Sequence, residues 1–315
     1  MFDQLLPTLR VLALPTKTNF RGVSVREVAL FRGPAGWAEF SPFIEYGDQE
    51  SSRWLACAIE AATRPRAQRF RHSIPVNGTI PAVSGGVELK TIVESYPGCR
   101  TFKVKVGENL EEDLLRLQAV QALRPDAKIR IDVNGLWSVE EALRNLSLIY
   151  SAIRNIEYVE QPCSTIDELR ALKLQADFPL KIAADEVIRK ADDPLAIDLK
   201  GAADFIMLKV QPLGGIEKSH AIATRHNLPV IVSSALESAV GIHYGLELAA
   251  SIEDMNFDCG LATGSLLAAD VAHLPIKNGA IELTDFEITV DGLDVSAERY
   301  EWWKNRAMRC AELLG

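Results

Sequence analysis

The sequence lacks the features that mark several common classes of protein. Its five cysteines are widely spaced and include no C-x-x-C pair, so reduced thiols are expected rather than a disulfide framework or a zinc site. A formal net charge of −9 and the absence of any Lys/Arg-rich run argue against nucleic-acid binding. No apolar run is long enough to cross a bilayer, and the N-terminus lacks the basic-then-apolar order of a secretory signal. We therefore expect a cytoplasmic protein with neither a nucleic acid nor a membrane as its partner, whereas the sequence leaves the oligomeric state open.

Two further absences narrow the possible chemistry. The five histidines are scattered without the spacing of metal ligands, so we expect them at the surface or at helix ends. No G-x-G-x-x-G motif follows a predicted strand, which argues against a dinucleotide-binding fold. What the chain does contain is a set of lysines and acids at the ends of apolar strands.

Residues 1–73 predict a small α+β domain. Strands are expected at 8–14, 23–31 and 37–40. The polar loop between the first two strands, 15–22, contains Phe20 and Arg21, and its position makes it a candidate to close over a substrate. A helical pattern then runs from Asp48 to about Arg64.

From residue 74 to residue 277, short apolar strands alternate with amphipathic helices. The predicted strands are 74–83, 101–106, 128–132, 156–160, 181–185, 205–209, 229–233 and 257–261. The predicted helix starts include the capping boxes Ser138/Glu141 and Thr165/Glu168 and the pair Asp193-Pro194. Six polar residues, 24 to 28 positions apart, end successive strands: Lys105, Asp132, Glu160, Asp185, Lys209 and Ser233. This repeat predicts an α/β fold, a modified (β/α)8-type (TIM-like) barrel. The tail, 278–315, is expected to return to the N-terminal capping domain and complete it.

In such a barrel the carboxyl ends of the strands meet at one mouth, where active sites lie. The stretch Phe102 to Gly107 alternates apolar and cationic residues, so Lys103 and Lys105 share one face of a strand. Two ammonium groups side by side are costly in an ordinary buried strand but reasonable if that face lines a polar cavity. The repeat therefore predicts that lysines and acids converge on one cavity.

Three strand-end carboxylates, Asp132, Glu160 and Asp185, suit a hard divalent cation such as Mg²⁺. With lysines on both flanks, the site is suited to removing a proton next to a substrate carboxylate, since the metal neutralises the charge that develops. A lysine must reach a pKa of roughly 7–8 to act as this base. Taken singly, each acid could be a helix cap and each lysine a solvated surface group. Their recurrence at equal spacing favours the functional interpretation.

Five motifs in this order resemble the enolase superfamily, and the two flanking lysines resemble its muconate-lactonizing subgroup. The motifs are Lys103-x-Lys105, Asp132-x-Asn134, Glu160-Gln161-Pro162, Asp185-Glu186 and the Lys209 of Ile-Met-Leu-Lys. The resemblance covers nearly the whole chain. It implies that Asp132, Glu160 and Asp185 hold Mg²⁺, that Lys105 is the base, and that Lys209 stabilises the enediolate from the opposite face.

Within the subgroup, further motifs are similar to the synthases that dehydrate 2-succinyl-6-hydroxy-2,4-cyclohexadiene-1-carboxylate to 2-succinylbenzoate in menaquinone biosynthesis. These motifs are Arg130-x-Asp132-x-Asn134, Ser233 to Ser238, and Gly260 to Thr263. The resemblance implies a small-molecule carboxylate substrate. The implied substrate-binding residues are Arg130, Asn134, Ser233, Gly260 and Leu261. The implied supporting residues are Lys103, which would lower the pKa of Lys105, and Glu186.

Two alternatives stay open. The same lysine pair suits an N-acylamino-acid racemase or a cycloisomerase of the subgroup, and a non-catalytic barrel could bind a metal or a carboxylate. Gly260-Leu261-Ala262 stands where dipeptide epimerases of the subgroup carry Asp-x-Asp, which counts against a dipeptide substrate. Binding alone would not need a base, so the flanking lysines favour an enzyme.

Overall fold

The N-terminal part is a three-stranded antiparallel sheet covered by helices. The computed structural model describes residues 2–20 and 22–315. Strands β1 (Arg10–Phe20), β2 (Val23–Gly33) and β3 (Gly36–Phe40) lie in this order, and helix α2 (Asp48–Thr63) packs against the sheet. A short helix α1 (Phe2–Leu5) and a 3-10 turn (Leu6–Thr8) precede β1.

The loop predicted at 15–22 is wrong in most of its length. Strand β1 continues to Phe20, because its ladder to β2 resumes with the pair Phe20 and Val23 after an irregularity beyond Pro15. Arg21, which was predicted to belong to the closing loop, lies outside the described residues. The other predicted elements of this part, three strands and a helix, are confirmed.

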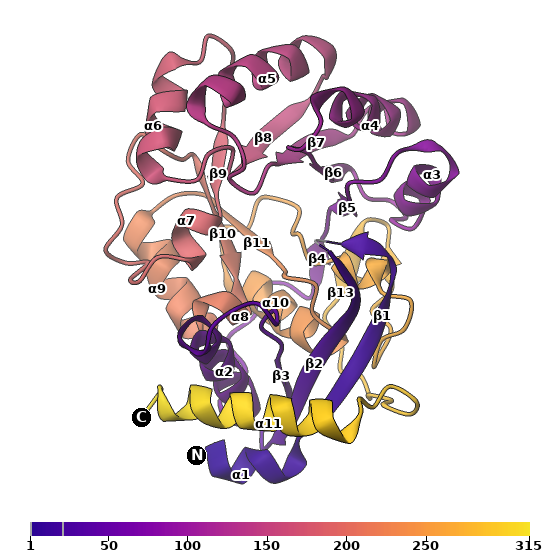
Figure 1. The fold of residues 1–315 in the computed structure, drawn as a ribbon, viewed down its shortest axis with the longest axis vertical. Coiled ribbons are helices and arrows are strands. Elements are labelled where there is room, and N and C mark those ends of the chain that lie inside the picture. The colour runs from indigo at the N-terminus through magenta and orange to yellow at the C-terminus, as the bar shows by residue number, and fades with distance from the viewer. Residues whose placement is uncertain (1, 21) are drawn as a thin grey trace.

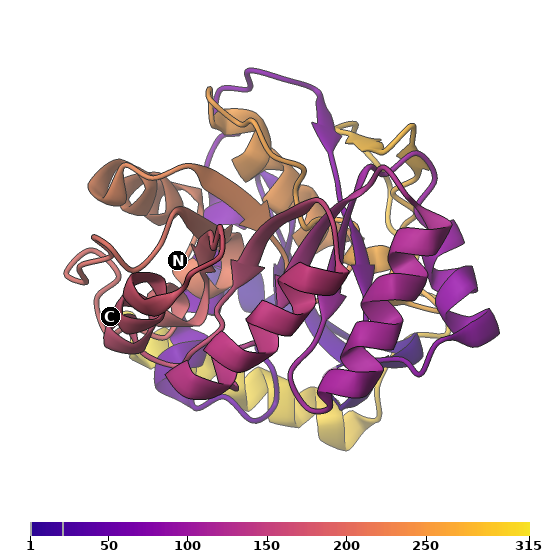
Figure 2. The same cartoon turned by 90° about the horizontal axis from the view of Figure 1, so that it is seen from above.

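A curved sheet of seven parallel strands forms the second part, in the chain order of its strands (Figures 1 and 2). The strands are β5 (Gly78–Ile80), β6 (Thr101–Lys105), β7 (Lys128–Asp132), β8 (Ile156–Glu160), β9 (Ile182–Ala184), β10 (Phe205–Lys209) and β11 (Val230–Ser233). The longer helices between them are α3 (Gly86–Glu94), α4 (Leu110–Leu123), α5 (Val139–Ala152), α6 (Ile166–Gln175), α9 (Ile216–His226) and α10 (Ala239–Ser251). This arrangement confirms the predicted α/β barrel fold with its capping domain.

Both predicted capping boxes are present. Ser138 Oγ accepts a hydrogen bond from the Glu141 N–H, and the Glu141 carboxylate accepts one from the Ser138 N–H. Thr165 and Glu168 repeat the pattern at the start of α6. Each box satisfies N–H groups that a helix start would otherwise leave unpaired.

Two other predicted elements are wrong in detail. Residues 74–83 are not one strand, because β4 (Ser73–Pro75) pairs with β13 (Ala280–Glu282) while only β5 joins the barrel. No helix begins at Asp193-Pro194: Asp193 Oδ1 accepts the Leu195 N–H and closes a turn, and the short helix α7 (Glu186–Arg189) follows Asp185 instead. A second short helix, α8 (Val210–Leu213), follows β10.

Residues 257–261 were predicted as the last strand and form none. This segment makes only two isolated parallel bridges, Cys259 with Val76 and Gly260 with Ser233. We call the segment 257–261 the seam, because its bridges join the β11 edge of the sheet to the chain just before β5.

The C-terminal part returns to the N-terminal sheet. After β12 (Ile276–Lys277) and β13, Asp294 bridges Leu12, and the Val295 N–H donates to the Val11 carbonyl. Helix α11 (Ala297–Glu312) then lies across the N-terminal layer (Figure 1), where Trp303 is buried with Phe40 and Trp54. The domain boundaries at 73/74 and 277/278 stay predictions, because the β12-β13-β4 sheet joins residues around both of them. Among the described residues, no helix has the length and apolar character needed to span a membrane.

Candidate active site

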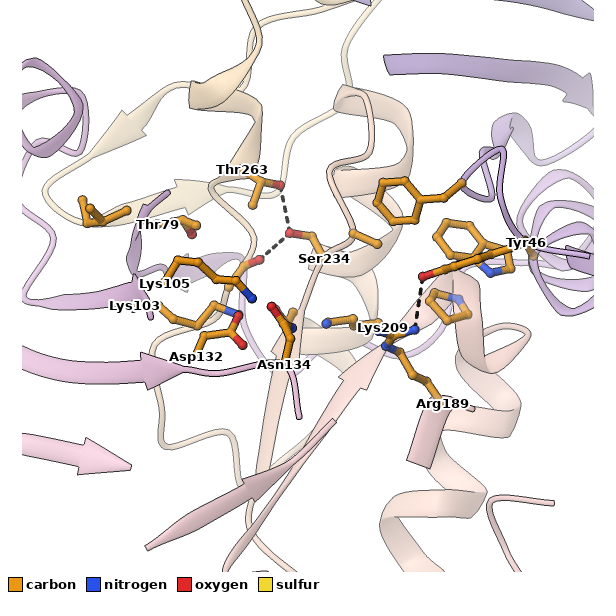
Figure 3. A pocket seen from close by; sticks show the side chains of 17 residues that line it. Tyr46, Thr79, Lys103, Lys105, Asp132, Asn134, Arg189, Lys209, Ser234 and Thr263 are labelled. Atoms are coloured by element: carbon orange, nitrogen blue, oxygen red, sulfur yellow. Dashed lines mark hydrogen bonds and ion pairs between the residues drawn. The ribbon is translucent and has the colours of Figure 1, made fainter. Parts of the chain in front are cut away.

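A pocket at the carboxyl ends of the barrel strands gathers side chains from both parts of the protein (Figure 3). Figure 3 shows Lys105 and Lys209 extending into it from two sides, with Asn134 between them and Asp132 beside Lys103 and Lys105. The barrel residues of its wall are Thr79, Ile80, Lys103, Lys105, Asp132, Asn134, Arg189, Lys209, Pro212, Ser233, Ser234, Ala235, Gly260 and Thr263. The N-terminal part contributes Phe43, Tyr46 and Trp54. The pocket thus contains both of the lysines, Lys105 and Lys209, that were predicted to flank the site.

Lys103 lies between two carboxylates. Its Nζ is 3.1 Å from Asp132 Oδ2 and 3.0 Å from Glu160 Oε2. Burial opposes the charge of Lys103, but Asp132 and Glu160 outweigh it and hold the pKa of Lys103 well above its ordinary value. Lys103 is therefore an ammonium ion at neutral pH.

The pKa values of Asp132 and Glu160 are shifted in opposite directions, although both acids contact Lys103. Burial opposes ionisation of Asp132, yet Lys103, Lys105 and Lys209 hold its pKa below the ordinary value. For Glu160, burial and the charge of Asp132 together raise the pKa to about 7. Asp132 is therefore the ionised partner of Lys103, whereas Glu160 ionises only near neutral pH.

Asp185 pairs with the second lysine. Lys209 Nζ donates to Asp185 Oδ2 at 2.5 Å, and Arg189 Nε lies 3.4 Å from Asp185 Oδ1. Burial opposes ionisation of Asp185, but Lys209 and Arg189 outweigh it and lower its pKa. Arg189 also donates to Glu186 Oε1 at 2.7 Å, the same oxygen that accepts from Asn134 Nδ2 at 3.0 Å. Glu186 therefore orients Asn134 on the pocket wall.

The three predicted metal ligands have the donor chemistry that Mg²⁺ requires. Asp132, Glu160 and Asp185 are at most 8% exposed, and Oδ1 of each aspartate accepts no hydrogen bond from the residues that the structure describes. Hard carboxylate oxygens with unused acceptor capacity suit a divalent cation. In the described part of the chain, however, no three acidic, histidine or cysteine side chains converge as a ligand set, since lysine ammonium groups lie against the acids. The negative charge and the donor atoms of these acids therefore suit Mg²⁺. In this structure, lysine ammonium groups balance that negative charge.

The predicted substrate-binding residues separate into two groups. Asn134, Ser233 and Gly260 line the pocket, whereas Arg130 and Leu261 do not. Leu261 is 1% exposed and belongs to the main hydrophobic core. Arg130 is completely buried, and its guanidinium donates to Glu157, to Asn77 Oδ1 and to the Asp258 carbonyl. The structure therefore places Arg130 and Leu261 away from the pocket wall, because internal partners hold the first and apolar packing holds the second; that they bind the substrate stays a prediction.

Several wall residues had no signal in the sequence. Phe43, Tyr46 and Trp54 come from the N-terminal part and face the pocket only because that part docks over the barrel. Arg189 could have been found, since it lies one helical turn after Asp185. Thr79 was hidden within the strand predicted at 74–83. Trp54 Nε1 and Thr79 Oγ1 are buried without a hydrogen-bond partner among the described residues, so both donors are available to a ligand.

Comparison with known proteins agrees with this geometry. Residues 88–290 match the enolase C-terminal domain-like family, and residues 11–62 match the enolase N-terminal domain-like family. Relatives named o-succinylbenzoate synthase come from Mycobacterium leprae (46% identity, covering 99% of this chain and 93% of the relative) and Mycolicibacterium smegmatis (43%, covering 99% and 98%).

Two solved structures show a similar fold. One is the muconate lactonizing enzyme of Pseudomonas fluorescens complexed with muconolactone, with a TM-score of 0.72 and 20% identity over 93% of this chain and 97% of that one. The other is the dipeptide epimerase of Enterococcus faecalis complexed with Mg and a dipeptide, with a TM-score of 0.73 and 21% identity over 91% and 98%. The chain belongs to the enolase superfamily, and its relatives of 43–46% identity are o-succinylbenzoate synthases.

Proposed function

We propose that the protein dehydrates 2-succinyl-6-hydroxy-2,4-cyclohexadiene-1-carboxylate to 2-succinylbenzoate, as an o-succinylbenzoate synthase of menaquinone biosynthesis. It is a hydro-lyase. The main observation that supports this function is a sequence identity of 43–46% to proteins named o-succinylbenzoate synthase over 99% of the chain. The pocket supports it, because Lys105 and Lys209 enter it from two sides and Asp132 lies in its wall, a placement suited to removing a proton beside a carboxylate.

Lys105 is the base in this proposal. Its Nζ takes the proton from the ring carbon that bears the carboxylate, and the C–H electrons move into that carboxylate. The same Nζ, now protonated, gives its proton to the departing hydroxyl as the electrons return to the ring and the C–O bond breaks. Water leaves, the ring becomes aromatic, and Lys105 is neutral again. One lysine can perform both transfers only if proton and hydroxyl leave from the same face.

Lys209 supplies a fixed positive charge on the opposite side of the substrate. Its hydrogen bond to Asp185 orients the ammonium, which stabilises the enediolate as charge moves onto the substrate carboxylate. When bound, Mg²⁺ held by Asp132, Glu160 and Asp185 would neutralise the same charge. Enolase superfamily members use Mg²⁺, in keeping with the donor chemistry of these acids.

The remaining site residues have supporting roles in this proposal. Lys103 keeps Asp132 and Glu160 from repelling each other. Asn134, Ser233 and Gly260 contact the substrate. We also propose that the reaction takes place in the cytoplasm, because the five cysteines are all free thiols.

Replacement of each lysine tests the mechanism. Lys105→Ala is expected to lower kcat by about 10³-fold or more, and Lys209→Ala by a similar factor, since each removes a group that acts in the transition state. Chelation by EDTA should abolish turnover and added Mg²⁺ should restore it. Lys128→Ala is the matched control, because Lys128 begins the same strand as Asp132 but its side chain is 60% exposed. Normal turnover by the Lys105 variant would refute the mechanism.

A second candidate is racemisation of N-acylamino acids. The placement of Lys105 and Lys209 on two sides of the pocket favours it, since one lysine could remove an α-proton and the other return one. Exchange of the α-hydrogen of N-succinylamino acids with deuterium, without any dehydration activity, would select this function over the first.

A further inference from the structure

The turn between β11 and α10 forms one wall of the pocket and is held in a strained conformation. Ser233, Ser234 and Ala235 line the pocket. The next residue, Leu236, has a φ of 61° and is completely buried. A bulky side chain rarely adopts this left-handed region, and such strain persists only where the surroundings impose it. Something must therefore hold residues 233–238 in place.

Two buried residues of the N-terminal sheet contact this turn. Arg26 of β2 is 2% exposed, and its Nε donates to the carbonyl of the strained Leu236 at 3.1 Å. Glu39 of β3 is 3% exposed and lies at the start of α10. Its carboxylate accepts hydrogen bonds from the Ser238 hydroxyl at 2.5 Å, the Ser238 N–H at 3.2 Å and the Gly241 N–H at 3.0 Å. The sheet thus fixes the turn at the strained carbonyl and at its end.

Glu39 suits this place because the first N–H groups of a helix have no partner within it. A carboxylate at that end is also stabilised by the helix dipole. Asp270 accepts the Ala239 N–H of the same helix start, so acids from two distant segments fix the beginning of α10. None of these contacts belongs to the proton-transfer machinery.

Glu60 provides an internal comparison. It also belongs to the N-terminal part, in α2, and its Oε1 accepts the Ile216 N–H at the start of α9 and the Tyr244 hydroxyl. The turn before α9 contains Gly214 and Gly215, and neither lines the pocket. Glu39 and Glu60 therefore make the same kind of docking contact, but only Glu39 acts on a wall of the pocket.

We propose that Glu39 is a positioning residue for substrate binding: from the N-terminal sheet it holds the strained Ser233–Ser238 turn so that Ser234 and Ala235 keep their place in the wall. The catalytic part of its test rests on the dehydration activity proposed above. Ser234 is oriented further by its hydrogen bonds to the Gly260 carbonyl at 2.6 Å and to Thr263 Oγ1 at 2.9 Å, so a displaced turn disturbs the seam side of the pocket as well.

Glu39→Gln and its matched control Glu60→Gln test this role. Each variant keeps the side-chain shape and removes the charge, so both are expected to lower the Tm. In Glu39→Gln, amide hydrogen exchange over residues 234–241 should become about tenfold faster and KM should rise about tenfold, since a hydrogen bond to a charged group contributes roughly that factor. Its kcat should change by less than about threefold, because Lys105 and Lys209 lie on other strands.

The control separates positioning from general destabilisation. In Glu60→Gln, faster exchange should be confined to the start of α9, and KM should stay at the wild-type value. Unchanged exchange over 234–241 in Glu39→Gln, or an equal rise of KM in both variants, would overturn the proposal. If the wild-type protein shows no dehydration, the proposed function fails and the exchange data alone decide the role of Glu39. If Glu39→Gln does not fold, Ser238→Ala removes one donor to Glu39 and should give the same two changes at smaller size.

Discussion

Lys103 neutralises two buried acids that would otherwise face each other. Lys103 Nζ lies 3.0 Å from Glu160 Oε2 and 3.1 Å from Asp132 Oδ2. Lys103 is therefore a poor candidate for the base, because two carboxylates stabilise its ammonium form and raise its pKa. Lys105, two residues later on the same face of β6, makes no comparable ion pair within the described residues and lines the pocket. At the residue scale, these neighbours favour Lys105 over Lys103 as the base that we propose.

Lys103→Met should therefore destabilise the metal-free protein strongly. Removing one partner of a buried ion pair leaves uncompensated charge and costs about 3 kcal/mol or more. We expect that loss in the free energy of unfolding measured with denaturant in EDTA, and a larger recovery on addition of Mg²⁺ than the wild type shows. Lys128→Met, which removes an exposed partner of Glu157, should cost less than about 1 kcal/mol. Equal stability of Lys103→Met and wild type in EDTA would contradict this assignment.

The identity of the polar strand-end residues could be predicted from sequence, but their partners could not. Equal spacing placed Lys105, Asp132 and Lys209 at one mouth, because parallel strands of one barrel end on the same side. Nothing local indicated that Arg130, on the same face of β7 as Asp132, is sequestered by Asn77 and Asp258. Such contacts join residues far apart in the chain, so they follow only from the closed fold.

The helices that follow the barrel strands begin where local chemistry dictates. Ser138 and Thr165 were predictable because a capping box needs only four consecutive residues. Asp193-Pro194 carries an equally favourable start, yet the Asp193 side chain closes a turn and the chain continues without a helix. The difference is that no amphipathic stretch of sufficient length follows Pro194, and caps alone do not offset the cost of helix nucleation.

Loss of a cap should be measurable in either helix. Ser138→Ala and Thr165→Ala are each expected to lower the free energy of unfolding by about 1 kcal/mol, because the N–H of the third helical residue loses its partner. Chemical denaturation of the two variants measures this loss. Ser151→Ala, an exposed change near the end of the same helix α5, should alter stability by only a few tenths of a kcal/mol. A similar loss from all three changes would argue against the capping role.

Contacts between the N-terminal sheet and the C-terminal segment join two distant parts of the chain in the fold. The C-terminal segment 278–315 bridges β1 and packs α11 on the N-terminal sheet, so it returns to that part as predicted for the tail. The same segment brings Phe286 against His243 of α10, with ring centroids 5.1 Å apart. Burial, which outweighs the attraction of Glu247, lowers the pKa of His243 from its ordinary value of 6.5 to about 4.

His243 should therefore make folding sensitive to acid. Below pH 6.5 this histidine becomes protonated in the unfolded chain but stays neutral in the folded protein. The free energy of unfolding therefore falls as the pH drops towards 4. We expect the wild type to lose about 3 kcal/mol over this window relative to His243→Gln, in which the side chain cannot ionise. Denaturant unfolding of both proteins at pH 7, 5.5 and 4 measures the difference. Parallel pH profiles would show that His243 is not held neutral.

The seam gives the barrel two kinds of wall. Lys105, Asp132 and Lys209 stand on strands joined by continuous ladders, whereas Gly260 belongs to a segment attached by two isolated bridges, next to Ser233. Substitutions along the ladders disturb the proposed proton-transfer residues themselves, whereas none of those residues belongs to the seam. Substitutions at the seam can therefore change which substrate the pocket accepts while the proposed proton-transfer residues stay the same. We expect changes of substrate preference to arise there first.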